Sequence, residues 1–241
     1  MSQVINTNVG ALFAGAALNK SANALQTAQA RLSSGLRINS AKDDATGLKI
    51  ATEYDSQVRG TNIAVRNAND AISKLQTVDG YASQITENLQ RLNEIFTQTG
   101  DVATTESTAL IAENARIAAL SAVAGALPGA VTVDGAGGTF TGASAAIAAP
   151  TATTAAGVLT DITAVTASRA TYGADMATLG SAVATMQTAS VNLSASYSRI
   201  MDTDYAAETA SMARNNILQQ AGTAVLAQAN QTPQTVLQLL R

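Results

Sequence analysis

Residues 158–200 read VLTDITAVTASRATYGADMATLGSAVATMQTASVNLSASYSRI, and their spacing organises the chain. Thirteen positions in this stretch lie alternately four and three residues apart, and most of them are apolar. Such alternation places apolar side chains along one side of a helix, as in a coiled coil. We therefore predict a long helix with one buried stripe, formed by Val158, Ile162, Val165, Arg169, Tyr172, Met176, Leu179, Val183, Met186, Ser190, Leu193, Tyr197 and Ile200.

A second stripe of the same kind precedes it and predicts another long helix. In this stripe Ile72, Leu75 and Val78 bring two spacings of three together, which predicts a stammer that overwinds a coiled coil locally. The predicted stripe consists of Tyr54, Val58, Thr61, Val65, Ala68, Ile72, Leu75, Val78, Ala82, Ile85, Leu89, Leu92 and Phe96.

The two ends of the chain carry shorter stripes. The first ends near Gly35, which is a typical helix stop, and Ser40 with Asp43 three residues later predicts the start of the next helix, with Asp44 also well placed against the helix dipole. The carboxyl-terminal stripe follows a polar interval at Asp202 and Asp204. The residues that we expect to form the seams of these ends are Leu18, Leu25, Leu32, Leu218, Val225, Val236 and Leu239.

The middle of the chain has a different composition. Residues 121–160 are rich in Ala, Thr and Gly and carry a single charge, Asp134. Residues 131–133 and 139–141 flank a glycine-rich run and predict a small β-hairpin. A shorter helix is expected just before, around Leu110, Ile117, Leu120 and Val123.

The composition argues against several classes of function. The chain has no His and no Cys, so it lacks the usual general base, thiol nucleophile and zinc ligands, and we expect no enzyme, no cofactor and no metal site. A net charge of -3 argues against a nucleic-acid partner. No apolar run is long enough to insert in a membrane, and residues 1–8 lack the charge of a secretory signal, so we expect export by another route.

Apolar stripes at the two ends predict self-association. Each exposed Leu-sized side chain forgoes about 1.5–3 kcal/mol of burial, and two thin helices rich in Ala cannot cover each other fully. A monomeric four-helix bundle is the alternative, but the joint near residues 34–41 separates the ends from the middle. We predict an all-α fold, an elongated antiparallel bundle with its terminal helices paired, whose copies join into an open helical polymer.

Five runs of residues resemble bacterial flagellin. RLSSGLRINSAKDDA at 31–45 and RNAND at 66–70 are similar to its amino-terminal region. SRIMDTDYA at 198–206, ILQQAG at 217–222 and ANQ at 229–231 are similar to its carboxyl-terminal region. The resemblance covers about residues 1–100 and 170–241, and it implies a flagellin with a reduced central region.

The resemblance implies a domain organisation and a set of partners. Residues 1–39 with 204–241 would form an inner terminal coiled coil, residues 40–125 with 158–203 a helical rod, and residues 126–157 a variable outer tip. The chain would be exported through the flagellar type III system and would form an extracellular filament for swimming. Its partners would be other copies of itself, an export chaperone, the filament cap and the hook-junction proteins.

The resemblance also implies a patch similar to the one that the innate flagellin receptor recognises. Here it would comprise Leu89, Arg91 and Glu94, although Asn93 stands where Arg is common in the family. A solvated helix face that packs against a neighbouring subunit is the alternative for this patch. For the whole chain, the alternatives to a filament subunit are a hook-filament junction protein and a secreted adhesin or glycan-binding surface protein that uses the central connector.

Overall fold

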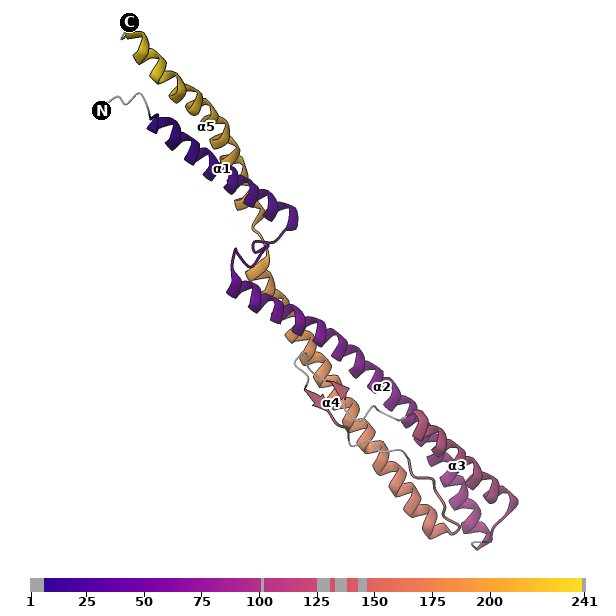
Figure 1. Cartoon of the computed structure of the whole chain (residues 1–241). Coiled ribbons are helices and arrows are strands. Elements are labelled where there is room, and N and C mark those ends of the chain that lie inside the picture. The colour runs from indigo at the N-terminus through magenta and orange to yellow at the C-terminus, as the bar shows by residue number, and fades with distance from the viewer. Residues whose placement is uncertain (1–6, 101, 125–130, 133–137, 143–146, 240–241) are drawn as a thin grey trace. The chain divides into compact units, whose positions relative to one another are not determined.

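The computed structural model describes residues 7–100, 102–124, 131–132, 138–142 and 147–239, with backbone alone for residues 232–239. Within these ranges the chain is almost entirely helical, as predicted (Figure 1). Its elements are α1 (Val9–Ser34), α2 (Ala45–Thr99), α3 (Thr105–Ala124), β1 (Val131–Thr132), β2 (Thr139–Phe140), α4 (Ala155–Met201) and α5 (Tyr205–Leu239).

The chain divides into two compact units. The terminal unit consists of Met1–Glu53 and Ala195–Arg241, and the central unit consists of Tyr54–Ser194. The terminal unit contains α1 and α5, whereas the central unit contains α3, the two strands and most of α2 and α4.

The stripe predicted for α4 supplies one side of the central core. All thirteen predicted positions are buried or half-buried, and Val158, Tyr172 and Leu179 are at most 1% exposed. Arg169 fits this stripe because its Nε donates to Asp79 Oδ1 of α2 at 2.8 Å. That hydrogen bond raises the pKa of Arg169 above its ordinary value. The prediction for α4 is confirmed.

The stripe of α2 differs from the predicted one over its first half. Ala64 and Ala71 are buried to 1% and 3% exposure, whereas Val65 and Ile72 are half-buried at the side of the core. From Thr61 to Leu92 the buried positions therefore alternate three and four residues apart, and the predicted stammer is wrong. A methyl group fits at the closest approach of two helices, so alanine takes the central line and the larger side chains flank it. The residues of α2 that are buried in the central unit are Thr61, Ala64, Ala68, Ala71, Leu75, Val78, Ala82, Ile85, Leu89, Leu92, Ile95 and Phe96.

The short helix and the hairpin complete the central unit. The shorter helix expected around Leu110, Ile117, Leu120 and Val123 is α3, in which Ile117 and Ala118 are buried, whereas Leu120 and Val123 are 41% and 81% exposed. The strands β1 and β2 pair antiparallel with Val131 opposite Phe140, which confirms the hairpin. The side chain of Val131 is buried in the same core as α2 and α4.

A turn at Gly35 ends α1 in the terminal unit. Its φ of 72° lies in the left-handed region, and its N–H donates to Arg31 O at 2.8 Å. The next residues pair with the segment before α5, since Arg37 N–H donates to Met201 O at 2.6 Å and Thr203 N–H donates to Gly35 O at 3.0 Å. These bonds tie the two passages of the chain together within the terminal unit.

The start of α2 lies later than predicted. Asp44 caps the helix, because its Oδ1 accepts the N–H of Gly47 at 2.8 Å. Asp43 instead accepts from the Ser40 hydroxyl and from the N–H groups of Ser40 and Asn39, and so holds the turn before the helix. These hydrogen bonds lower the pKa of Asp43 below its ordinary value, and the bond from the Ser40 hydroxyl has the largest effect. The prediction that the helix begins at Ser40 is therefore wrong, because Ser40 donates to the Asp43 carboxylate in the turn and does not cap a helix.

We expect Leu179→Ala to lower the free energy of unfolding by about 2–5 kcal/mol, because it removes a fully buried side chain from the core of the central unit. Leu159→Ala is the matched control on the same helix, since Leu159 is 54% exposed, and it should change stability by less than about 0.5 kcal/mol. Urea unfolding followed by circular dichroism measures both. Equal losses for the two variants would contradict the packing described for α4.

We expect Gly35→Ala to destabilise the terminal unit by about 1–2 kcal/mol, the cost of a left-handed conformation for an L residue. The new Cβ would also lie 2.9 Å from the Tyr205 hydroxyl oxygen. Gly15→Ala, inside α1 with open space around it, should stabilise by roughly 0.5–1 kcal/mol. Thermal melting of the two variants gives the test, and shifts of the same sign would refute the role of Gly35.

Candidate assembly surface of the terminal helices

The two terminal helices pack against each other in antiparallel fashion, as predicted (Figure 1). Near the start of α1, Asn8 Nδ2 donates to Ala229 O at 2.8 Å. Near its end, Arg31 Nη1 lies 3.7 Å from Glu208 Oε2. The pairing therefore extends along the length of α1.

The interface between α1 and α5 buries little apolar surface. On α1, only Ala14 and Ala28 are buried, and the leucines of the seam are half-buried. Gly222 of α5 lets Leu18 approach, because a Cβ there would lie 3.2 Å from Leu18 Cδ1. The half-buried positions of α5 that alternate four and three residues apart include amides and a carboxylate: Glu208, Met212, Asn215, Gln219, Gly222, Leu226 and Ala229.

The predicted seam residues are therefore distributed unevenly. The structure places Leu18, Leu25 and Leu32 at the interface, all half-buried. Leu218 and Val225 lie beside it and are 49% and 57% exposed, because the interface of α5 follows the amide-containing positions instead. The side chains of Val236 and Leu239 are outside the described residues.

Leu18, Leu218 and Val225 come together with Phe13 at an apolar groove between the two helices. The groove has a volume of about 540 Å³, and its polar lining includes Lys20, Ser21 and Asn215. Large apolar side chains on both helices stay in solvent, among them Phe13 at 77% exposure. Among the described side chains of these helices, the exposed aliphatic ones are Val9, Leu12, Ile217, Leu218 and Val225.

Four of these residues were not predicted from the sequence: Val9, Leu12, Phe13 and Ile217. The sequence analysis follows one apolar stripe along each helix, and these four residues lie beside the stripe of their helix. A count of large apolar residues outside the stripe would have found them. Exposed apolar side chains on a pair of helices with an apolar groove between them are typical of a site of protein association. A protein partner that covers these side chains would remove their apolar area from water.

The predicted receptor-like patch is split between core and surface of the central unit. Leu89 is 1% exposed and belongs to the core. Arg91 lies on the surface, where its Nε contacts Glu106 Oε1 and its Nη1 contacts Glu94 Oε2, each at 3.0 Å. Both hydrogen bonds raise the pKa of Arg91 above its ordinary value, and the bond to Glu106 has the larger effect. Arg91 and Glu94 are thus the members of this trio that a partner would meet.

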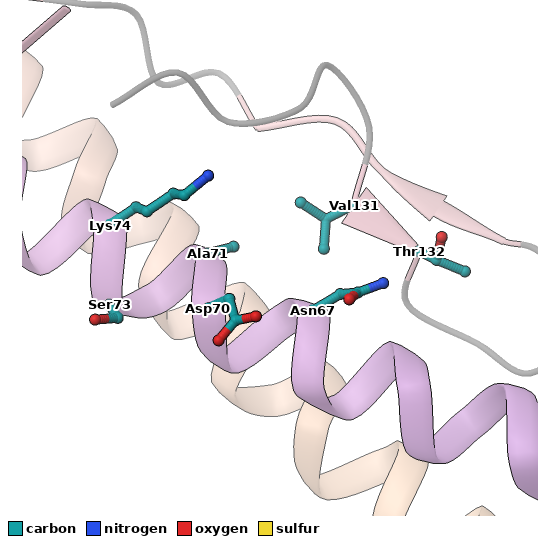
Figure 2. Close-up of a pocket in the computed structure, with 7 residues that line it drawn as sticks. All are labelled: Asn67, Asp70, Ala71, Ser73, Lys74, Val131 and Thr132. Carbon is teal, nitrogen blue, oxygen red and sulfur yellow. The ribbon is translucent and has the colours of Figure 1, made fainter. Parts of the chain in front are cut away.

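A polar pocket of about 530 Å³ lies between α2 and β1 in the central unit. Figure 2 shows Val131 and Thr132 of the strand standing over Asn67, Ala71 and Lys74 of the helix. Asp70 and Ser73 complete the described lining. One charge of each sign and several hydrogen-bonding groups select no single class of ligand. Within the described part of the chain, no group of His, Cys, Asp and Glu residues is arranged to hold a metal ion.

None of the helices, over the residues described, has an apolar stretch that would span a bilayer.

Two family models match the chain. The model for the bacterial flagellin N-terminal helical region matches residues 5–135, and the model for the bacterial flagellin C-terminal helical region matches residues 156–240. Only residues 136–155 lie between the two matches, which confirms the predicted reduction of the central region.

Similar curated proteins are flagellins of enteric bacteria. The chain is 50% identical to flagellin of Salmonella rubislaw over 107 residues, which is 44% of this chain and 22% of that protein. The figures are the same for flagellin of Escherichia coli strain K12. With flagellin of Escherichia coli O127:H6 the identity is 52% over 98 residues, or 41% of this chain and 18% of that protein. The match thus spans about a fifth of the length of these relatives.

Proposed function

Because this chain belongs to the bacterial flagellin family, we propose that it is a structural subunit that assembles with copies of itself into the flagellar filament. The observation that carries the proposal is the exposed apolar surface of the paired helices α1 and α5, with Phe13 77% and Ile217 65% exposed. Burial of such side chains contributes about 1.5–3 kcal/mol each. A structural role of this kind needs no catalytic group.

Assembly between unlike surfaces of successive copies accounts for an open polymer. If the groove beside Leu18 and Leu218 receives a different face of the next copy, the contact repeats without closing and gives a helical filament. Contacts of the same patch with itself would stop at a dimer instead. The presence of apolar side chains both inside the groove and outside it, such as Leu12, supports the open arrangement.

We assign the parts of the chain to the roles that the family implies. Residues 1–39 and 204–241 form the inner part of the filament, residues 40–125 and 158–203 the rod, and residues 126–157 the outer tip. The packing of α1 on α5 supports the first assignment.

The proposed route and partners follow from the same membership. The chain is exported through the flagellar type III system to the extracellular filament, and it meets an export chaperone, the filament cap and the hook-junction proteins on the way. Arg91 and Glu94, which are exposed, would present the surface for an innate flagellin receptor.

The double variant Phe13→Ser with Ile217→Ser tests the proposed assembly. Both side chains are exposed, so the isolated chain should keep its helicity and melting temperature. Filament growth from seeds should nevertheless slow at least about tenfold, because two apolar anchors are lost from the subunit contact. Light scattering and electron microscopy of seeded full-length protein measure growth and filament diameter.

Asn19→Ser with Gln26→Ser provides the control, since these exposed residues lie on α1 and outside the groove. It should polymerise at the rate of the unaltered chain. Normal growth of the Phe13 and Ile217 variant would refute assembly through the terminal helices.

A further inference from the structure

Three of the residues that α3 buries in the central unit are polar: Ser107, Asn114 and Ser121. They lie on a line of positions three and four residues apart, Ser107, Leu110, Asn114, Ile117, Ser121 and Ala124, with the half-buried Ile111 and the buried Ala118 beside it. Ser107, Asn114 and Ser121 lie seven residues apart and are at most 1% exposed. The side chains that α4 buries in the same core are larger and mostly apolar, among them Tyr172 and Leu179. Apolar packing therefore holds α3 less firmly than α4.

One of these three polar side chains bonds to another helix. Asn88 Nδ2 of α2 donates to Asn114 Oδ1 at 2.8 Å, and Gln84 Nε2 donates to Asn88 Oδ1 at 3.3 Å. The hydroxyls of Ser107 and Ser121 donate to carbonyls within one turn of their own chain, those of Thr104 and Ala118.

The amide of Asn114 is only partly satisfied. Its Nδ2 is buried and has no hydrogen-bond partner among the described residues. A buried amide whose NH2 group makes no hydrogen bond is costly, so the position would favour an apolar residue if stability alone mattered. In helix pairs, a single buried Asn at such a position is a known means of fixing the register at a cost in stability.

The pattern of α3 needs such a device because it nearly repeats itself. A slide of seven residues would bring Ser107 to the place of Asn114 and Leu110 to the place of Ile117. Polar side chains would replace polar ones and apolar side chains would replace apolar ones, with Ile111 taking the place of Ala118. The connection of residues 100–104 can span up to about 17 Å when extended, which accommodates a slide of about 10 Å.

The remaining contacts of α3 distinguish the two registers weakly. The ion pair of Arg91 with Glu106 is more than half exposed on both sides, and such pairs contribute little. Leu120 and Val123 face solvent and add no packing to the observed register.

We propose that the hydrogen bond between Asn88 and Asn114 is a register lock, which selects one of two nearly equivalent positions of α3 along α2. The amide of Asn114 reaches Asn88 in the observed register alone, because the serines seven residues away carry no amide. Without the lock, α3 occupies both positions while remaining helical and docked.

A distance measurement between α2 and α3 tests the lock. Gln76→Cys on α2 and Ala109→Cys on α3 introduce exposed sites for nitroxide labels in a chain that has no cysteine of its own. Because the helices run antiparallel, these sites lie about 25 Å apart along the axis. A slide of seven residues changes that separation by about 10 Å. Pulsed electron resonance then reports the register of α3 directly.

The labelled chain should give one distance, and adding Asn114→Ser should give a second population displaced by about 10 Å. Asn88→Ser should also give the second population, because it removes the donor of the same hydrogen bond. Asn93→Ser, which replaces another half-buried Asn of α2 that lies about 140° around the helix from Asn88, is the control and should keep one distance.

A single unchanged distance in both Asn114→Ser and Asn88→Ser would overturn the proposal. Loss of helicity in both, seen by circular dichroism, would overturn it as well, since Leu110 and Ile117 should keep α3 docked in either register. Neither outcome bears on filament assembly, which rests on the terminal helices.

Discussion

The sparse apolar packing between the antiparallel helices α1 and α5 is the constraint on which the proposed assembly depends. The contact is made of alanine, glycine and amides, and on α1 only Ala14 and Ala28 are fully buried. An alanine methyl contributes less than about 1 kcal/mol when buried, against about 1.5–3 kcal/mol for a leucine. The central unit, in contrast, buries Leu89, Phe96 and Tyr172 almost completely. One unit of the chain is therefore stable through its own core, and the other leaves apolar surface for neighbours to cover.

The same contrast explains what could be predicted from the sequence. The stripe of α4 was predicted residue by residue, because large apolar side chains recur at its buried positions. In α2 the pattern misled, since Val65 and Ile72 are larger than Ala64 and Ala71 yet lie beside the central line. In α5 the residues at the interface include the amides Asn215 and Gln219, so a search for apolar residues selected the exposed Leu218 and Val225 instead. Hydrophobic periodicity finds a helix reliably, but small or polar seam residues hide which side faces its partner.

Polar groups at the helix contacts have a common physical role. The Arg169–Asp79 pair, the Asn88–Asn114 bond and the Asn8 bond to Ala229 each join two helices at one specific height. Apolar side chains of similar size tolerate sliding, whereas a hydrogen bond between helices is satisfied in one register. A thin, alanine-rich chain has few bulky side chains to interlock, so these directional contacts determine how its helices align.

Hydrogen exchange of the full-length chain, dilute and at neutral pH, tests most directly whether the terminal helices are incompletely covered in a lone subunit. Amides of α1 and α5 should exchange at least about tenfold faster than those of residues 158–186 in α4, and should slow markedly once filaments have grown. Protection of α1 and α5 equal to that of α4 in the dilute chain would contradict the claim that these helices need a neighbouring copy.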